Sequence, residues 1–408
     1  MKPLGPIPPG YTAIDGELAV GDRTASALVK EAGRTPLFVY SRDMMAQRAA
    51  RLRDVMPDRL WINYAIKANS FPPLLAHMTN LVDGFDIASG GELGFALAAG
   101  MDPSRISFAG PGKRDEELAA AIQAGVTLNL ESEAEAHRAI AIGSQLGIRP
   151  RLAIRVNPDF ELRGSGMKMG GGAKPFGMDA DRVPALAREL VQADCEWQGL
   201  HIYSGSQSLD AEAIIEAQVN VLALADRIAR EGGVPIPKLN MGGGFGIPYF
   251  AGDTPLNIAA IGAALAEACD NLPPTLAQSE LHIELGRYLV GEAGVYLTRI
   301  VDRKESHGET FLITDGGLHH QLAASGNFGT VVRRNYPLAV ASRFDASADE
   351  IANVVGCLCT PLDRLADKAH LPRAEAGDLV AVFCAGAYGA SASPSAFLGQ
   401  GPAAEILV

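Results

Sequence analysis

The sequence predicts an α/β protein, a (β/α)8 barrel followed by a β-rich domain. At 408 residues the chain is long enough for two hydrophobic cores. Between residues 36 and 290, short apolar runs alternate with Ala-rich helical stretches, whereas helical patterns become rare from residue 291 onward. We therefore expect a barrel over 36–290 and a β-rich domain over 291–408, with residues 1–35 joining the second domain.

The alternation resolves into eight strand and helix units, which is the number that a barrel requires; an open doubly wound sheet is the structural alternative. After an apolar run at 36–40, the expected strands are 61–66, 84–88, 105–109, 126–130, 151–156, 197–203, 238–241 and 281–285. The expected helices are 43–55, 91–99, 115–124, 133–146, 184–193, 211–231 and 258–271.

The β-rich part shows strand patterns at 295–304, 310–314, 351–355 and 378–383, and residues 11–20 could add strands to it. One segment of the barrel part, 163–174, is too rich in glycine for a packed element. We expect it to form a mobile loop at the mouth of the barrel.

Charge and cysteine content limit the classes of function. Lys and Arg number 35 against 47 Asp and Glu, a net charge of −12, and there is no basic tract. This argues against nucleic acid or an anionic membrane as partner. No apolar run is long enough to span a membrane, and the N-terminus has no signal core. The five cysteines form no disulfide or zinc pattern, so we expect a reducing, cytoplasmic setting.

Lys67, at the end of the first apolar barrel run, is the leading candidate for chemistry. A buried ammonium is costly unless it is paired or used. The side chain could extend from the strand end into water, or it could serve as an amine nucleophile that forms a Schiff base. The hexapeptide around it leaves both interpretations open.

Polar residues and glycines also follow the other expected strands, where barrel enzymes carry their active sites. Three successive glycines at 242–244 would let backbone N–H groups approach an anion, and Gly286-Arg287 adds a guanidinium suited to phosphate. A phosphate site near the last strands together with a Schiff-base lysine indicates pyridoxal phosphate (PLP).

The segments 64–69, 86–92, 174–177, 241–249, 284–288, 359–363 and 386–388 together resemble the fold-type III PLP-dependent decarboxylases, the ornithine and diaminopimelate decarboxylase family. The resemblance runs in order from about residue 34 to the C-terminus. It implies a barrel like that of alanine racemase, a C-terminal β domain, and a homodimer that shares its active sites at the interface.

The resemblance also implies residue roles. Lys67 would bind the cofactor covalently, and Glu284 would pair with the pyridine nitrogen. Cys359 would reach in from the partner subunit as a second catalytic residue. We assign Cys195, Cys269 and Cys384 as buried structural thiols, the usual role of a free cysteine. Asp86, Glu92 and Arg155 would support the inner rim. The phosphate would be held by Ser206, Gly243, Gly244, Gly286, Arg287 and Tyr388.

Three departures from the family pattern concern the ring and the substrate. Tyr203 stands where the family usually places a histidine that stacks on the cofactor; we expect Tyr203 to stack, with His201 as second choice. Thr360 replaces the usual acidic residue after the cysteine. The family's arginine segment is replaced after residue 317 by a sequence that includes His319, His320 and Asn327.

These departures predict that Thr360, His319 and Asn327 contact the substrate, while no metal site is expected because His319 and His320 lack a third ligand. Segments 201–207 and 318–329 resemble the decarboxylase subgroup associated with exosortase systems. The expected reaction is α-decarboxylation of an L-amino acid, either free or modified, for example tethered to an acyl carrier. The alternatives are a diaminopimelate, lysine or ornithine decarboxylase proper, an amino-acid racemase, and a non-catalytic PLP-binding protein.

Overall fold

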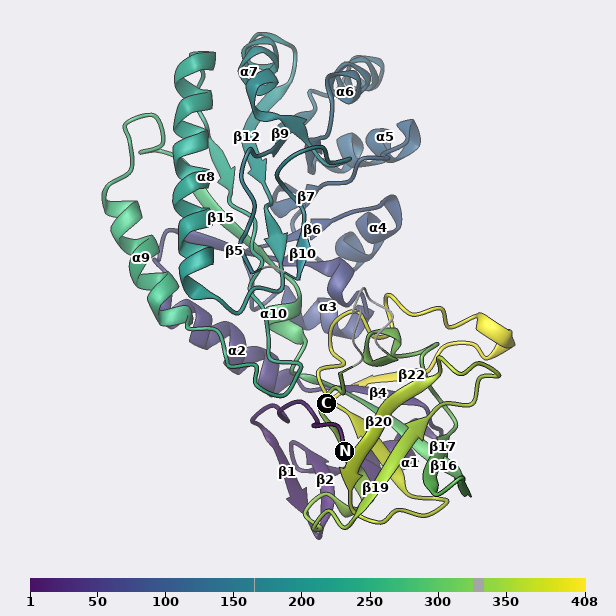
Figure 1. Cartoon of the computed structure of the whole chain (residues 1–408). Helices are drawn as coiled ribbons and strands as arrows, with labels where there is room; N and C mark the ends of the chain where they lie inside the picture. The colour runs from purple at the N-terminus through teal and green to yellow at the C-terminus, as the bar shows by residue number, and fades with distance from the viewer. Residues whose placement is uncertain (165, 326–333) are drawn as a thin grey trace. The chain divides into compact units, whose positions relative to one another are not determined.

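The computed structural model describes residues 1–164, 166–325 and 334–408 (Figure 1). The chain divides into two compact units. The barrel unit comprises Ala49–Gly246 and Leu256–Gly286, and the β unit comprises Met1–Arg48, Ile247–Pro255 and Arg287–Val408.

The core of the barrel unit is a closed ring of eight parallel strands, as the alternation of apolar and helical segments predicts. Each strand pairs in parallel with the next, and pairing of β8 with β9 and of β15 with β5 closes the ring. Side chains at the carboxyl ends of these strands therefore meet at one rim. The strands are β5 Leu60–Ala65, β6 Gly84–Ile87, β7 Ile106–Phe108, β8 Thr127–Leu130, β9 Arg151–Asn157, β12 Glu196–Ile202, β14 Lys238–Asn240 and β15 Glu280–Leu285.

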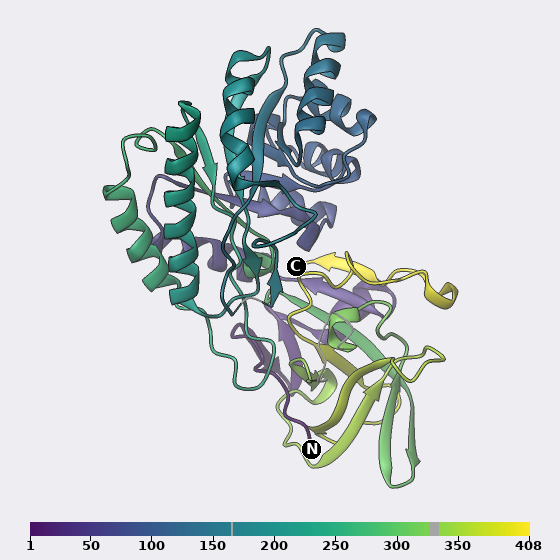
Figure 2. The same cartoon turned by 45° about the horizontal axis from the view of Figure 1, so that its top comes forward.

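Helices lie outside the strands, as the teal and blue ribbons show in both views (Figures 1 and 2). Side chains of Ser89, Ser132 and Asp210 cap the N-termini of α4, α6 and α8. The short α3, which begins with two prolines, was not predicted. The helices are α2 Arg42–Val55, α3 Pro72–Met78, α4 Gly90–Ala98, α5 Asp115–Ala124, α6 Glu133–Leu146, α7 Val183–Gln192, α8 Ala211–Gly232 and α9 Ile258–Asp270.

The glycine-rich segment after β9 differs from the loop that its composition predicts. It contains a short strand, β10 Met167–Lys168, which pairs antiparallel with β13 Gly205–Ser206. A second short strand, β11 Met178–Asp179, continues the sheet beside β9. Backbone pairing does not depend on side-chain volume, which explains how a glycine-rich sequence can still form it.

The β unit is built on a mainly antiparallel sheet, in which β16 pairs with β17, β21 and β4. The run at 36–40 forms β4 Leu37–Tyr40, which lies between β16 and β22. The long β16–β17 hairpin can be followed in green in Figure 2. The strands are β16 Gly294–Ser306, β17 Glu309–Thr314, β18 Leu338–Val340, β19 Glu350–Val355, β20 Arg364–Leu371, β21 Leu379–Val382 and β22 Ala404–Leu407.

The N-terminal residues complete the β unit. A small sheet of β1 Tyr11–Ile14, β2 Glu17–Val20 and β3 Arg23–Thr24 precedes α1 Ala25–Ala32, so strands occur where the sequence suggested them. Buried side chains from these elements and from the large sheet form one apolar cluster. Within the described ranges, no helix has the length and apolarity needed to cross a membrane.

Candidate active site

Lys67 lies at the carboxyl end of β5, in the short 3-10 turn Ile66–Ala68. Ile66 and Ala68 are buried, whereas Lys67 is exposed. The turn therefore directs the lysine out of the packed strand end. Its ammonium lies 5.6 Å from the centre of the Tyr203 ring, within the range of a cation–π contact.

The positive charge of Lys67 acts on three carboxyl groups at this rim. Burial raises the pKa of both Asp86 and Glu92, and the Lys67 charge opposes that rise. Glu92 is also held by the backbone N–H of Ala88, at 2.6 Å. Glu284 is the third carboxyl group on which the Lys67 charge acts. An amine so close to several acidic groups is placed for proton transfer as well as for nucleophilic attack.

Glu284 is buried at the end of β15 and is nevertheless ionised. Burial alone would raise its pKa, but the attraction and hydrogen bond of His201 outweigh that effect and, with Lys67 and Arg155, lower the pKa to about 2. Nε2 of His201 donates to Oε2 of Glu284 at 2.8 Å, and the Asn240 amide donates to the same oxygen at 3.2 Å.

Asp86 and Glu284 are driven toward opposite protonation states. Burial and repulsion by the Glu284 charge hold the pKa of Asp86 well above its usual range, although the Ser107 hydroxyl donates a hydrogen bond to it. Carboxyl groups whose surroundings separate their pKa values in this way are typical of active sites.

The glycines of 242–244 and Gly286 allow close backbone approach at this rim. Gly242 and Gly244 have φ of 70° and 84°, which favours glycine. A Cβ on Gly243 would lie 2.0 Å from the Glu284 carbonyl oxygen, and one on Gly286 would lie 2.8 Å from the Cβ of Ala68. Ser206, partly exposed on β13, lies in the segment that pairs with β10.

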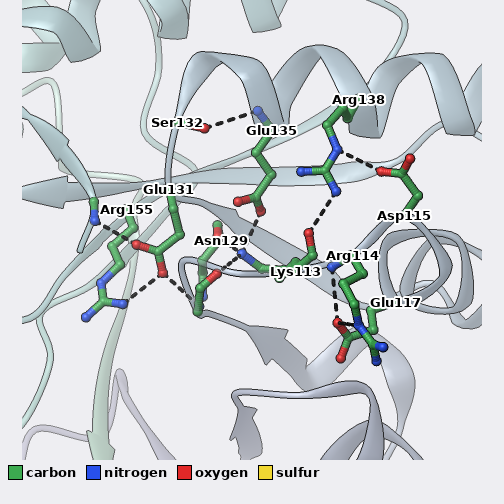
Figure 3. Close-up of polar contacts among 12 residues, drawn as sticks. Lys113, Arg114, Asp115, Glu117, Asn129, Glu131, Ser132, Glu135, Arg138 and Arg155 are labelled. Atoms are coloured by element: carbon green, nitrogen blue, oxygen red, sulfur yellow. Dashed lines mark hydrogen bonds and ion pairs between the residues drawn. The ribbon is translucent and has the colours of Figure 1, made fainter. Parts of the chain in front are cut away.

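Arg155 is held by Glu131, a residue that the sequence analysis missed. Its Nη1 donates to Glu131 at 2.8 Å, and the same carboxylate accepts the backbone N–H groups of Gly110 (2.7 Å) and Gly177 (2.6 Å). Glu131 thus joins the segments after β7 and β9 (Figure 3). The sequence feature that could have indicated Glu131 is its position as an acidic residue directly after a buried strand.

A second buried ion pair lies next to this cluster. Lys113 bonds Glu135 at 2.6 Å and also donates to the backbone carbonyls of Gly110 and Asn129 (Figure 3). Every ammonium hydrogen of Lys113 therefore has an acceptor within the protein. This lysine is structural, in contrast to the exposed Lys67.

In the β unit, Arg287 and Tyr388 form a cationic cluster. Nη1 of Arg287 donates to the Tyr249 hydroxyl at 2.8 Å, and the guanidinium lies 4.8 Å from the centre of the Tyr388 ring. Burial lowers the pKa of Arg287, but Tyr249 and Tyr388 outweigh that effect, so it stays protonated. Tyr388 adopts a φ of 58°, which is unusual for a tyrosine.

The loop that carries Cys359 and Thr360 is anchored by Asp363. This buried carboxylate accepts backbone N–H groups from Leu318 (2.7 Å) and Leu358 (2.8 Å). Cys359 itself is exposed and Thr360 is partly exposed. The same anchor therefore positions both the cysteine loop and the start of the His319 segment.

The two adjacent histidines differ in their surroundings. Nε2 of His320 donates to the Gly401 carbonyl at 2.9 Å, so in the neutral ring Nδ1 accepts from the Tyr296 hydroxyl at 3.1 Å. Burial lowers the pKa of His320 to about 4. His319 is fully buried, and neither ring nitrogen has a hydrogen-bond partner among the described residues. Asn327 lies outside the described residues.

The residues present at the barrel rim fit PLP. An exposed amine, an ionised buried carboxylate and a glycine backbone with room only for hydrogen are the groups that an aldehyde, a pyridinium and a phosphate require. Fold and site together define the class of (β/α)8-barrel enzymes that use PLP.

Comparison with known proteins narrows this class. Residues 42–291 match the family described as pyridoxal-dependent decarboxylase, pyridoxal binding domain. The chain is 36% identical to the L-glutamyl-[BtrI acyl-carrier protein] decarboxylase of Niallia circulans, over 91% of this chain and 88% of that protein. It is 33% identical to diaminopimelate decarboxylase of Aquifex aeolicus, over 97% and 91%.

A solved structure agrees with these relatives. The diaminopimelate decarboxylase of Helicobacter pylori, an I148L mutant complexed with L-lysine, superposes with a TM-score of 0.83 at 27% identity, covering 93% of each chain. The chain belongs to the family of pyridoxal-dependent decarboxylases. It is a PLP-dependent carboxy-lyase that acts on an amino acid.

Proposed function

We propose that Lys67, Tyr203 and Glu284 form the centre of a decarboxylase whose substrate is an L-amino acid with an uncharged distal end. A glutamyl group joined to an acyl carrier through a thioester is the leading case. The contact between the Lys67 ammonium and the Tyr203 ring, beside the ionised Glu284, is the observation that carries the proposal.

PLP, when bound, supplies an electron sink for the bond between Cα and the carboxylate as CO2 leaves. Lys67 would hold the cofactor covalently, and Tyr203 would cover one face of its ring. Glu284 would keep a proton on the ring nitrogen because its own pKa is about 2. Gly243, Gly244, Gly286 and Ser206 would hold the phosphate; Asp86 and Arg155 would support the rim.

The substrate class rests on charge. Residues 318–325, where the family carries its arginine segment, contain no residue that is charged at neutral pH, because burial lowers the pKa of both His319 and His320. Thr360 likewise offers no carboxylate. A free distal ammonium or carboxylate would have no charged partner from these residues, and such mismatches discriminate strongly between substrates. The relative that acts on a carrier-bound glutamyl group supports the same conclusion.

The test is CO2 release from matched substrates. We expect turnover of glutamate loaded onto an acyl carrier protein or a short thioester mimic, and little from free glutamate, lysine, ornithine or diaminopimelate. Brisk turnover of free glutamate, lysine, ornithine or diaminopimelate would refute the substrate class. Chiral analysis of the recovered substrate separates decarboxylation from racemisation.

We also propose a homodimer in which Cys359 acts in the partner subunit's active site and protonates the product carbon. Beside the cysteine loop lies an open hollow of about 430 Å³ with a mixed lining. Phe311, Ile313 and Pro361 contribute apolar surface, and Lys304, Asp363 and Arg364 contribute charged groups. Together with Leu362, which is 54% exposed, the apolar part of this surface supports burial against a second copy.

Mixed dimers test this arrangement. Lys67→Ala and Cys359→Ala subunits, each inactive alone, should regain about one quarter of wild-type activity after random mixing, since half the dimers are mixed and each has one intact site. No recovery in verified mixed dimers would show that both residues serve the same subunit's site.

We further propose a reducing, cytoplasmic location, which the five free thiols support.

A further inference from the structure

His201 and Glu284 form a buried pair across the barrel interior. The His201 side chain is 2% exposed and that of Glu284 is 6% exposed. Nε2 of His201 lies 2.8 Å from Oε2 of Glu284, whereas Nδ1 of His201 has no partner among the described residues. Buried polar side chains need a hydrogen-bond partner, and for His201 that partner is Glu284.

The pair is extended by Asn240 on the strand between them. His201 on β12 is the register partner of Asn240 on β14, and β14 pairs with β15, which carries Glu284. The Asn240 amide donates to Oε2 of Glu284 at 3.2 Å. Both side-chain bonds use Oε2, so neither occupies Oε1 of the carboxylate. The two donors fix the carboxylate in one orientation.

His201 also opposes the effect that would protonate Glu284. Burial alone disfavours the carboxylate form and would raise the pKa of Glu284. His201 provides the largest opposing contribution, ahead of Lys67 and Arg155. Without His201, the pKa of Glu284 should rise, and a neutral carboxyl group could no longer hold a proton on the ring nitrogen.

We infer that His201 is a positioning residue that keeps Glu284 ionised and oriented, rather than a residue that stacks on the cofactor. The inference rests on the proposed pairing of Glu284 with the ring nitrogen. It separates the two aromatic residues of the 201–207 segment by role: Tyr203 faces the Lys67 amine, and His201 acts through Glu284.

The test compares binding of PLP with binding of its carbon analogue, in which C–H replaces the ring nitrogen. Wild type should prefer PLP. His201→Phe should reduce that preference roughly 10-fold or more, the usual worth of a hydrogen bond to a charged group. In His201→Phe the preference for PLP should return as the pH rises above the raised pKa of Glu284, because the carboxyl group then ionises again. A variant that had only a structural defect would not regain the preference in this way. His201→Gln, which keeps an N–H donor, should restore part of the preference.

His282→Gln is the matched control, because His282 is also a buried barrel histidine but pairs with Glu280. It should leave the preference unchanged. If Glu284→Gln keeps the full preference for PLP, the proposed role of Glu284 fails. If Glu284→Gln abolishes the preference while folded His201→Phe retains it at every pH, the inference about His201 alone is overturned.

Discussion

The ammonium of Lys67 lies 5.6 Å from the centre of the Tyr203 ring. Tyr203 stands where the family's pattern has a histidine, and the aromatic ring is the property that the two residue types share. We predict that Tyr203→Phe keeps cofactor affinity near that of wild type, whereas Tyr203→Ala weakens it about 2–10-fold through loss of ring stacking. Equilibrium dialysis measures both. Equal losses in the two variants would assign the effect to the hydroxyl instead.

Lys67→Ala should abolish both the visible absorption of the lysine-bound cofactor and CO2 release, because no other side chain would replace the amine. Absorption spectroscopy of the purified protein and a CO2 assay provide the measurements. Lys238→Ala is the control, since Lys238 opens β14 at the opposite end of the barrel and pairs with Glu280. Retained absorption in Lys67→Ala would disprove the assignment of Lys67.

Glu131→Gln should destabilise the barrel and loosen the glycine-rich segment. Breaking a buried ion pair costs about 3–5 kcal/mol, because Arg155 would remain buried with a weaker acceptor. The Gly177 N–H would also lose its charged acceptor. We expect a lower Tm and faster proteolysis within 158–177.

Glu135→Gln is the matched control for Glu131→Gln, because its side chain is equally buried and its ion pair with Lys113 lies next to the same cluster (Figure 3). It should also lower Tm, but without new cleavage in the glycine-rich segment. The same cleavage pattern in both variants would mean that the segment responds to general loss of stability.

Short-range patterns predicted the barrel well because each strand and helix carries its own periodicity. The strand-end positions of Lys67 and Glu284 followed from that alternation, and the comparisons confirmed the fold, the family and the cofactor. Pairing between segments that are distant in the sequence was harder to predict. The run at 36–40 is apolar enough for either unit, and only its pairing with β16 and β22 places it in the β unit's sheet.

The roles of His201 and Glu131 depend on contacts that no local pattern specifies. Strand alternation indicates which side of β12 His201 takes, but not that Glu284, 83 positions later, is its partner. Glu131 lies in no glycine-rich or aromatic motif, and its three donors come from three separate segments. The contacts of His201 and Glu131 form only in the closed barrel, so the sequence alone does not reveal the roles of these two residues.

The buried His320 should make the stability of the protein depend on pH. Its pKa is lowered by burial to about 4 in the folded chain, against about 6.5 in an unfolded one. The unfolded state therefore binds more protons between these values. The stabilisation is complete above about pH 6.5 and is lost as the pH falls toward 4, roughly 3 kcal/mol in all. Denaturant unfolding of wild type and His320→Gln should show a flatter pH dependence in the variant. His137→Gln, at an exposed histidine, should keep the wild-type slope. An unchanged slope in His320→Gln would show that other groups produce the pH dependence.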